Sequence, residues 1–158
     1  MIEKFFHYSF LDGRLIGSEH PGNLGNARAV GEHFVRDRGV RTFVLLAQHD
    51  VALRIPELEQ HHRPIRSPPT AREVEEVLVI VRRGLVGGDS VWVACDQGLD
   101  RTGCVMGCLL TRMGIPPDQA IEELLARFPP RRRTPVYREL WEPYATLVRC
   151  FGRQPKGE

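Results

Sequence analysis

The sequence predicts an α/β fold in which helices cover both faces of a central, mostly parallel sheet, giving three layers. The first observation is that two β-rich apolar stretches, at residues 40–47 and 91–93, alternate along the chain with helical patterns. Strands that alternate with helices are typical of parallel sheets in α/β proteins. The second observation is that only helical patterns follow residue 100, so we expect helices at the C-terminal end of the domain.

Length and composition limit the architecture and the partners. A chain of 158 residues can bury one core, and we expect a single domain over residues 1–152 with a short frayed tail at residues 153–158. The net charge of +2 is too small to indicate a nucleic acid or a membrane surface as a partner. No apolar run approaches ~20 residues, so we expect no membrane span and no signal peptide. We expect a monomer in the cytoplasm.

The predicted elements follow in chain order: a hairpin with strands at residues 5–11 and 14–17, a helix at 27–38, strands at 40–47 and 62–65, a helix at 70–83, a strand at 91–93, and helices at 101–113, at 116–128 and from 134 onward. Asp12-Gly13 supplies the positive φ of a tight hairpin turn, and Gly39 ends the first helix. Thr70 and Glu73 form a capping box that opens the next helix.

The helical patterns also predict which side chains face the core: Val30, Phe34, Val74, Val77, Leu78, Val81, Ile121, Leu124, Leu125, Phe128, Leu140, Tyr144, Leu147, Val148 and Phe151. Pro143 lies inside the last of these patterns. Because proline cannot donate a helical hydrogen bond, we expect it to kink that helix or to move its start to Glu142.

The loop between the strand at residues 91–93 and the following helix carries the strongest functional signal. Cys95 and Arg101 lie six positions apart, Gly98 lies between them, and Thr102 follows. A loop that curls into a helix N-terminus directs backbone N–H groups at one centre and binds an anion with several oxygens. The guanidinium of Arg101 adds a planar fork of donors.

A cysteine at the floor of such an electropositive site favours the thiolate form, which is the nucleophile. The chemistry this suits is attack on phosphorus, giving a thiophosphate that water then cleaves. In the second step, Thr102 is placed to donate its hydroxyl to the departing thiolate.

The motif Cys95-x-x-Gly98-x-x-Arg101-Thr102-Gly103 resembles the signature of the protein-tyrosine phosphatase superfamily, most closely its compact dual-specificity branch. The resemblance implies a phosphatase-type three-layer fold and a phosphomonoesterase that needs no metal or other cofactor. Its partner would be a phosphorylated protein or a small phosphomonoester. The implied phosphate cradle consists of Asp96, Gln97, Gly98, Leu99, Asp100 and Arg101.

Two positions in or beside the loop, Ala94 and Leu99, depart from the family pattern. The family places His directly before the nucleophile, where it orients the cysteine and helps to acidify it, but this chain has Ala94. We therefore expect a slower first step. Leu99 stands where lipid- and inositol-directed members often carry Lys, and Asp96 lowers the local positive potential. Both favour phosphotyrosine or another singly phosphorylated substrate.

The general acid also departs from the pattern. The family places an Asp about 30 residues upstream, after a strand that resembles residues 62–65, but residues 66–69 here contain no carboxylate. Asp100 is the preferred replacement, because the order Gly-x-Asp-Arg-Thr resembles that of phosphoinositide phosphatases in the same superfamily. The alternative is that Asp100 faces solvent and pairs with Arg. Weaker candidates for the acid are Asp50, Glu57 and Glu59.

The basic cluster Arg131-Arg132-Arg133 lies between two predicted helices. It is either a solvated loop or, as the resemblance implies, a border of the phosphate pocket that favours acidic substrates. The pair His61-His62 lacks an acidic or Cys partner at metal-ligand spacing, so we expect side chains of a solvated loop or of a strand edge there and no metal site.

The other cysteines and the rival functions remain open at this point. Cys104 and Cys108 are one turn apart, and we expect small core residues, with a regulatory bridge to Cys95 as the alternative. The leading rival function is a binding module that keeps the cradle without efficient turnover. A phosphatase of phosphoinositides or other non-protein substrates and, more distantly, a rhodanese-like sulfur carrier are further alternatives.

Overall fold

The computed structural model describes residues 4–153, and within these residues five strands form one sheet. In spatial order they are β1 (His7–Phe10), β2 (Leu15–Ser18), β5 (Ser90–Ala94), β3 (Val40–Leu45) and β4 (Glu59–His62). β1 is antiparallel to β2, whereas the other neighbouring pairs are parallel. The predicted mostly parallel sheet is confirmed, and β5 lies at its centre.

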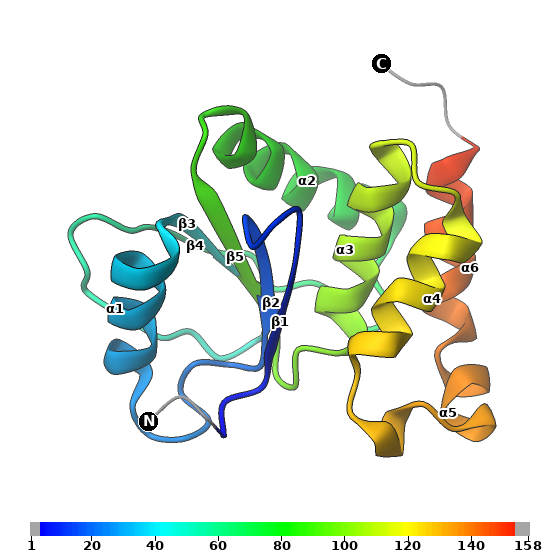
Figure 1. The fold of residues 1–158 in the computed structure, drawn as a ribbon, viewed down its shortest axis with the longest axis horizontal. Coiled ribbons are helices and arrows are strands. Elements are labelled where there is room, and N and C mark those ends of the chain that lie inside the picture. The colour runs from blue at the N-terminus through cyan, green and yellow to red at the C-terminus, as the bar shows by residue number, and fades with distance from the viewer. Residues whose placement is uncertain (1–3, 154–158) are drawn as a thin grey trace.

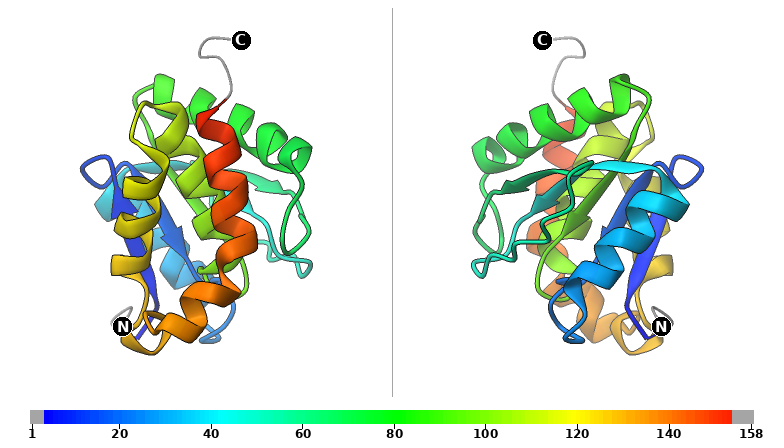
Figure 2. Two further views of the ribbon diagram at one scale, coloured as in Figure 1. Left: turned by 90° about the vertical axis from the view of Figure 1, so that its right-hand side faces the viewer. Right: turned by 90° about the vertical axis from the view of Figure 1, so that its left-hand side faces the viewer.

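The helices lie on both sides of the sheet and complete three layers (Figure 1). The elements are α1 (Ala27–Arg38) on one face, with α2 (Ala71–Val86), α3 (Asp100–Arg112), α4 (Pro117–Arg127) and α6 (Glu142–Gly152) on the other, and with the 3-10 helix η1 (Pro130–Arg132) and α5 (Pro135–Leu140) at one end. The two side views show α1 alone over its face and α4 and α6 over the opposite one (Figure 2). A separate buried hydrophobic cluster fills the space on each face of the sheet.

Several local predictions are confirmed. The turn between β1 and β2 has positive φ at Asp12 and Gly13, and also at Leu11, which the sequence did not indicate. Gly39 ends α1 with a φ of 68°. The capping box of α2 forms as predicted, since the Thr70 side chain accepts from the Glu73 N–H and the Glu73 carboxylate accepts from the Thr70 N–H.

The predicted strand at residues 62–65 is wrong by three residues. The strand runs from Glu59 to His62 and pairs in parallel with β3 at the edge of the sheet. Its four polar residues have no apolar alternation, because an edge strand is held by its backbone and needs few buried side chains. The next residues continue with isolated bonds only, from Arg63 N–H to the Leu45 carbonyl and from Ile65 N–H to the Leu46 carbonyl.

The predicted last helix is divided in two at Trp141. Pro143 has no N–H, so the α5 pattern cannot continue through it, and α6 starts at Glu142, one of the two outcomes expected. The inward position predicted for Leu140 is wrong, because its side chain is 67% exposed and the neighbouring Trp141 is buried in its place.

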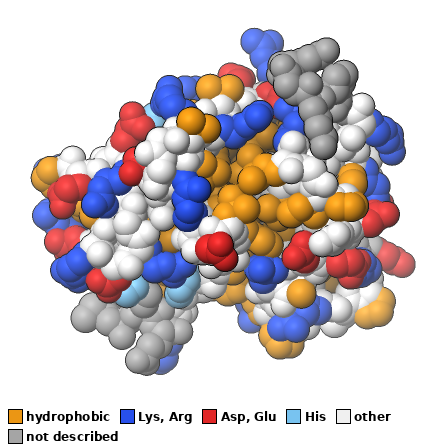
Figure 3. Space-filling model, turned by 45° about the horizontal axis from the view of Figure 1, so that its top comes forward, with side chains coloured by type: hydrophobic (Ala, Val, Ile, Leu, Met, Phe, Trp, Pro, Cys, Tyr) orange, Lys and Arg blue, Asp and Glu red, His pale blue; other side chains and the backbone are white. Residues whose placement is uncertain are grey.

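The two ends of the sheet differ. The end that carries α5 and the loop after β5 lies at the bottom of Figure 1. Seen from the opposite end, hydrophobic side chains gather on the surface (Figure 3). Between residues 4 and 153, no helix combines the length and the apolar character needed to cross a bilayer. Of the predicted tail, residues 154–158 lie outside the described part.

Candidate active site

The loop from Cys95 to Leu99 joins the central strand β5 to α3, so its ends are fixed by the core. Cys95 is only 2% exposed and lies directly after the last residue of β5. Gly98 has a φ of 77°, and a Cβ there would lie 2.5 Å from the carbonyl carbon of Ser18. The loop therefore packs closely against the end of β2, and only glycine fits at this point.

The Asp96 carbonyl is held by the segment after β2. It accepts hydrogen bonds from the His20 N–H at 3.1 Å and from Asn23 Nδ2 at 2.8 Å. The peptide bond between Asp96 and Gln97 is trans, so the Gln97 N–H points in the opposite direction, away from these two residues.

Tyr8 of β1 holds a second carbonyl of the loop, that of Gly98. Its hydroxyl donates to the Gly98 carbonyl at 2.8 Å, so the Leu99 N–H points to the other side. Gly17 makes room for this tyrosine, since a Cβ at Gly17 would lie 2.7 Å from the Tyr8 ring. Burial, followed by the nearby Cys95, raises the pKa of Tyr8 well above its ordinary value, so the hydroxyl stays a donor.

Arg101 lies in the first turn of α3 and its side chain is 12% exposed. Its Nη2 is 2.7 Å from Asp96 Oδ2, and its Nη1 donates to the Leu46 carbonyl at 3.4 Å. The guanidinium thus closes the loop between its first acidic residue and the end of β3. Thr102, the next residue, is fully buried, and its hydroxyl has no hydrogen-bond partner among residues 4–153.

Asp100 is the first residue of α3, and it faces α5. Its Oδ1 accepts a hydrogen bond of 2.6 Å from the Tyr137 hydroxyl. Burial and this bond to the carboxylate raise the pKa of Tyr137, which keeps the phenol protonated near neutral pH. The alternative expected from the sequence was that Asp100 faces solvent and pairs with an arginine. Among residues 4–153, no arginine forms an ion pair with Asp100.

The region where the family carries its acid has other contacts here. The Arg66 N–H donates to Glu73, and the Ser67 hydroxyl lies 2.7 Å from the Tyr144 hydroxyl. The weaker acid candidates lie elsewhere. Asp50 follows β3, where its Oδ1 accepts from the Val51 N–H.

The three basic residues of the predicted cluster separate in the structure. Arg132 donates to Gln97 Oε1 at 2.6 Å. Arg131 lines a surface hollow beside the loop, together with Gln97 and Leu99. Arg133 donates to the Phe128 carbonyl at 2.7 Å and lines a different hollow. Of the three, Arg131 and Arg132 therefore border the loop.

The paired histidines contact residues of their own strand and of the segment after β3. His61 lies 3.2 Å from Glu59, and His62 contacts the Ala47 carbonyl at 2.8 Å. The part of the chain that the structure describes contains no group of three or more His, Cys, Asp or Glu side chains suited to a metal.

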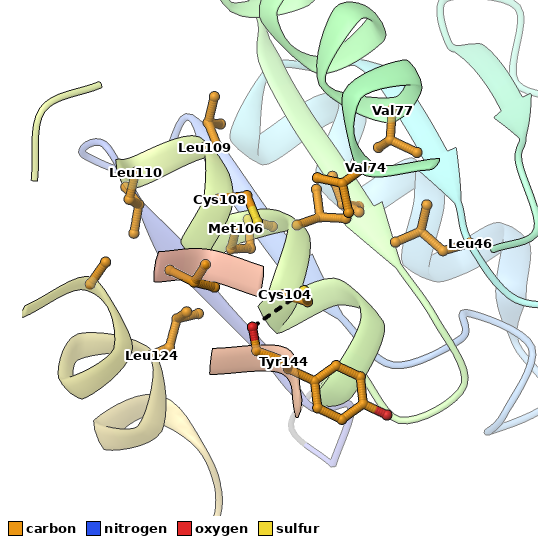
Figure 4. Packing of buried hydrophobic residues seen from close by; sticks show 14 of the residues in the cluster. Leu46, Val74, Val77, Cys104, Met106, Cys108, Leu109, Leu110, Leu124 and Tyr144 are labelled. Atoms are coloured by element: carbon orange, nitrogen blue, oxygen red, sulfur yellow. Dashed lines mark hydrogen bonds between the residues drawn. The ribbon is translucent and has the colours of Figure 1, made fainter. Parts of the chain in front are cut away.

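Cys104 and Cys108 are fully buried in the core around α3 (Figure 4). The Cys104 thiol points to the Tyr144 carbonyl at 3.9 Å. Burial raises the pKa of the Cys108 thiol well above its ordinary value, which keeps it in its less reactive form.

Three residues that hold the loop were not found from the sequence, namely Tyr8, Asn23 and Tyr137. For Tyr8 a signal existed in the register of the hairpin, which pairs it with Gly17 across the strands. Asn23 and Tyr137 reach the loop from irregular or later segments, and sequence spacing gives no sign of such contacts.

The chain is similar to known proteins over most of its length. A family model described as "Tc-R-P: Polymorphic toxin system, DSP-PTPase phosphatase" matches residues 16–115, which include the whole loop and α3. Among solved structures, TpbA of P. aeruginosa is 18% identical with a TM-score of 0.70, and the match covers 96% of this chain and 92% of that chain.

Two further structures are similar. Human DUSP28 is 16% identical with a TM-score of 0.63, and the match covers 85% of this chain and 90% of that one. PTPMT1 in complex with PI(5)P is 15% identical with a TM-score of 0.65, covering 92% of this chain and 97% of the other. These structures share the three-layer phosphatase fold, and the family model spans more than half of the chain. The chain belongs to the DSP-PTPase phosphatase family.

Proposed function

We propose that this phosphatase hydrolyses phosphomonoesters through a cysteinyl-phosphate formed on Cys95. The observation that carries the proposal is the buried Cys95 at the start of a loop whose Asp96 and Gly98 carbonyls accept hydrogen bonds from other segments of the chain. We infer that the loop N–H groups opposite these carbonyls, together with the guanidinium of Arg101, bind the oxygens of a phosphoryl group and stabilise the charge that develops on it.

The proposed reaction has two steps. In the first, the Cys95 thiolate attacks phosphorus, the bond to the leaving oxygen breaks, and that oxygen takes a proton from an acid. In the second, water attacks the phosphoryl group, the P–S bond breaks, and the Thr102 hydroxyl donates to the departing thiolate. The Thr102 hydroxyl is buried and has no hydrogen-bond partner among residues 4–153, which supports this role.

Asp100 is the proposed acid and base. Its carboxyl group accepts a hydrogen bond from the Tyr137 hydroxyl. In the proposal it gives a proton to the leaving oxygen in the first step and takes one from water in the second. Leaving groups that are poor without protonation depend most on the first of these transfers. Replacing Asp100 with Asn should slow hydrolysis of an alkyl phosphate by roughly 10²-fold or more, and of an aryl phosphate by less. An unchanged kcat on the alkyl phosphate would remove Asp100 from this role.

An aryl-phosphate assay with the Cys95→Ser variant as a control tests the proposal as a whole. We expect turnover by the natural sequence and none by the variant. A second candidate function is a phosphate-binding module without efficient turnover, which Ala94 and the lack of a carboxylate at residues 66–69 favour. Phosphate binding by both proteins without turnover by either would support this second function.

The substrate class is proposed from the surroundings of the loop. Arg131, beside Lys4 on the rim of one hollow, favours an acidic group near the scissile phosphate. A phosphotyrosine peptide with acidic neighbours is our first candidate substrate. Because the similar PTPMT1 structure holds PI(5)P, a phosphoinositide belongs in the same panel. Higher kcat/KM on the phosphoinositide than on the peptide would overturn the preference for a protein substrate.

A further inference from the structure

We use the name phosphate loop for the segment from Cys95 to Arg101. Two side chains from outside this segment each hold one of its side chains. Arg132 of η1 donates to Gln97 Oε1 at 2.6 Å, and Tyr137 of α5 donates to Asp100 Oδ1 at 2.6 Å. The two holding residues also contact each other, because the Arg132 guanidinium lies over the Tyr137 ring, 4.9 Å from its centroid. A continuous chain of contacts therefore runs from residue 97 to residue 100 outside the loop.

This chain is anchored in the core. Tyr137 is 8% exposed, and its ring packs edge-on against Phe128, with 6.4 Å between the centroids. Its N–H donates to the Thr134 hydroxyl, which caps α5. The short helix η1 that carries Arg132 begins with Pro130, after Pro129, which restricts its backbone. Both holding residues are thus fixed before any ligand arrives.

We propose that Arg132 and Tyr137 are positioning residues that keep the phosphate loop coiled. The inference rests on the proposed function of the loop, and it assigns to Arg132 a role different from substrate contact. The four residues from Gln97 to Asp100 include Gly98, whose backbone is intrinsically free to adopt other conformations. The hydrogen bonds from Arg132 to Gln97 and from Tyr137 to Asp100 restrain both ends of this segment. The restrained loop therefore loses less conformational entropy on binding a phosphoryl group than an unrestrained loop would.

The two roles for Arg132 give different results. A positioning residue affects every ligand of the loop, including inorganic phosphate, which is too small to reach beyond it. A substrate contact affects only ligands with a second acidic group, and it leaves phosphate binding unchanged. The hydroxyl of Tyr137 touches a side chain that the proposed mechanism uses, so kcat alone cannot separate positioning from proton transfer there.

The test measures binding of inorganic phosphate and of orthovanadate by calorimetry in the variants Arg132→Ala, Tyr137→Phe and their combination. We expect each single variant to weaken binding roughly 3- to 10-fold, as for loss of one hydrogen bond of ordinary net strength. Since both act through one chain of contacts, the double variant should weaken binding by less than the product of the two single effects. Arg132→Lys, which keeps a donor, should restore part of the affinity.

The matched control is Arg138→Gln. Arg138 lies next to Tyr137 on α5, but it pairs with Glu122, away from the loop. This variant removes one positive charge from the same segment, and it should leave phosphate binding within twofold of the natural sequence. Thermal unfolding of every variant separates loss of the loop geometry from loss of the fold.

A second readout is the protection of Cys95 from alkylation by bound phosphate. Looser coiling should weaken this protection in both single variants. Unchanged phosphate affinity and unchanged protection of Cys95 in Arg132→Ala and Tyr137→Phe would overturn the inference. If the natural sequence binds phosphate without turning over any ester, the proposed hydrolysis fails, while these binding measurements still decide the role of Arg132 and Tyr137.

Discussion

Gly98 occupies the point where the phosphate loop passes closest to the backbone of β2. Replacing Gly98 with Ala would place a methyl group 2.5 Å from the Ser18 carbonyl carbon and force a positive φ on a residue with a side chain. We expect the loop to shift, with loss of phosphate binding by roughly 10-fold or more. Calorimetry with phosphate checks this. As a control, Gly88→Ala also changes a glycine with positive φ, but no atom lies within 4 Å of its added Cβ. Equal effects in the two variants would contradict the account.

Asp96 is the residue in the loop whose charge opposes the substrate. Its carboxylate lies 2.7 Å from Arg101, where it competes with a phosphoryl group for the same donors. Replacing Asp96 with Asn should lower KM for a dianionic aryl phosphate about 2- to 5-fold at low salt, because an exposed ion pair is worth only about 0.2–1 kcal/mol. The effect should fade at high salt. A higher KM would show that Asp96 is needed to orient Arg101.

At the scale of single residues, spacing in the sequence indicated the sulfur, the guanidinium and the glycine between them. It did so because all three lie in one short loop, whose geometry depends on its own residues. Tyr8 was not found, because its role depends on the register of a hairpin and on the absence of a side chain at Gly17. Contacts of this kind join distant segments, and local patterns carry little information about them.

The start of α2 links helix stability to the segment before it. Glu73 accepts from the Thr70 N–H and also from the Arg66 N–H, so one carboxylate holds both the helix end and residues 66–69. Replacing Thr70 with Ala should lower the free energy of unfolding by about 1 kcal/mol. Urea denaturation checks this. Thr134→Ala serves as a comparison, because it also removes a side-chain cap, in this case from α5. A loss at Thr70 near zero would show that the box contributes nothing here.

At the scale of elements, the helices were predicted more closely than the edge strand. Helix α1 has the predicted bounds, since Gly39 and the spacing of Val30 and Phe34 are local signals. β4 was misplaced because it is held by backbone bonds to β3 and has no apolar pattern of its own. The division at Trp141 was predicted as one outcome of Pro143, but the outward turn of Leu140 depends on the angle between α5 and α6.

Aromatic rings from β3, β5 and α1 cluster on the face of the sheet covered by α1. The Trp92 ring lies 3.9 Å from Phe43 and 4.9 Å from Phe34, measured between centroids. Replacing Phe34 with Ala should lower the free energy of unfolding by about 3–5 kcal/mol. Val86→Ala, at a side chain that is 88% exposed, should change it by less than about 0.5 kcal/mol. Urea denaturation compares both, and equal losses would contradict this view of the core.

At the scale of the molecule, the alternation of strands and helices predicted three layers, but it did not predict the strand order. The order places β5 between β2 and β3, so the loop after β5 is surrounded by the carboxyl ends of two parallel neighbours. Ligands of parallel α/β sheets commonly bind at this edge. The order follows from pairing between distant segments, which a single sequence does not display.

The central claim is that the phosphoryl group of the substrate is transferred to the sulfur of Cys95 during turnover. Rapid acid quenching of the enzyme with an aryl phosphate, followed by mass spectrometry of its peptides, tests this claim most directly. The account predicts a phosphoryl group on the peptide that contains Cys95, and its absence from Cys95→Ser. Turnover that persists in Cys95→Ser, or a phosphoryl group found only on another residue, would contradict it.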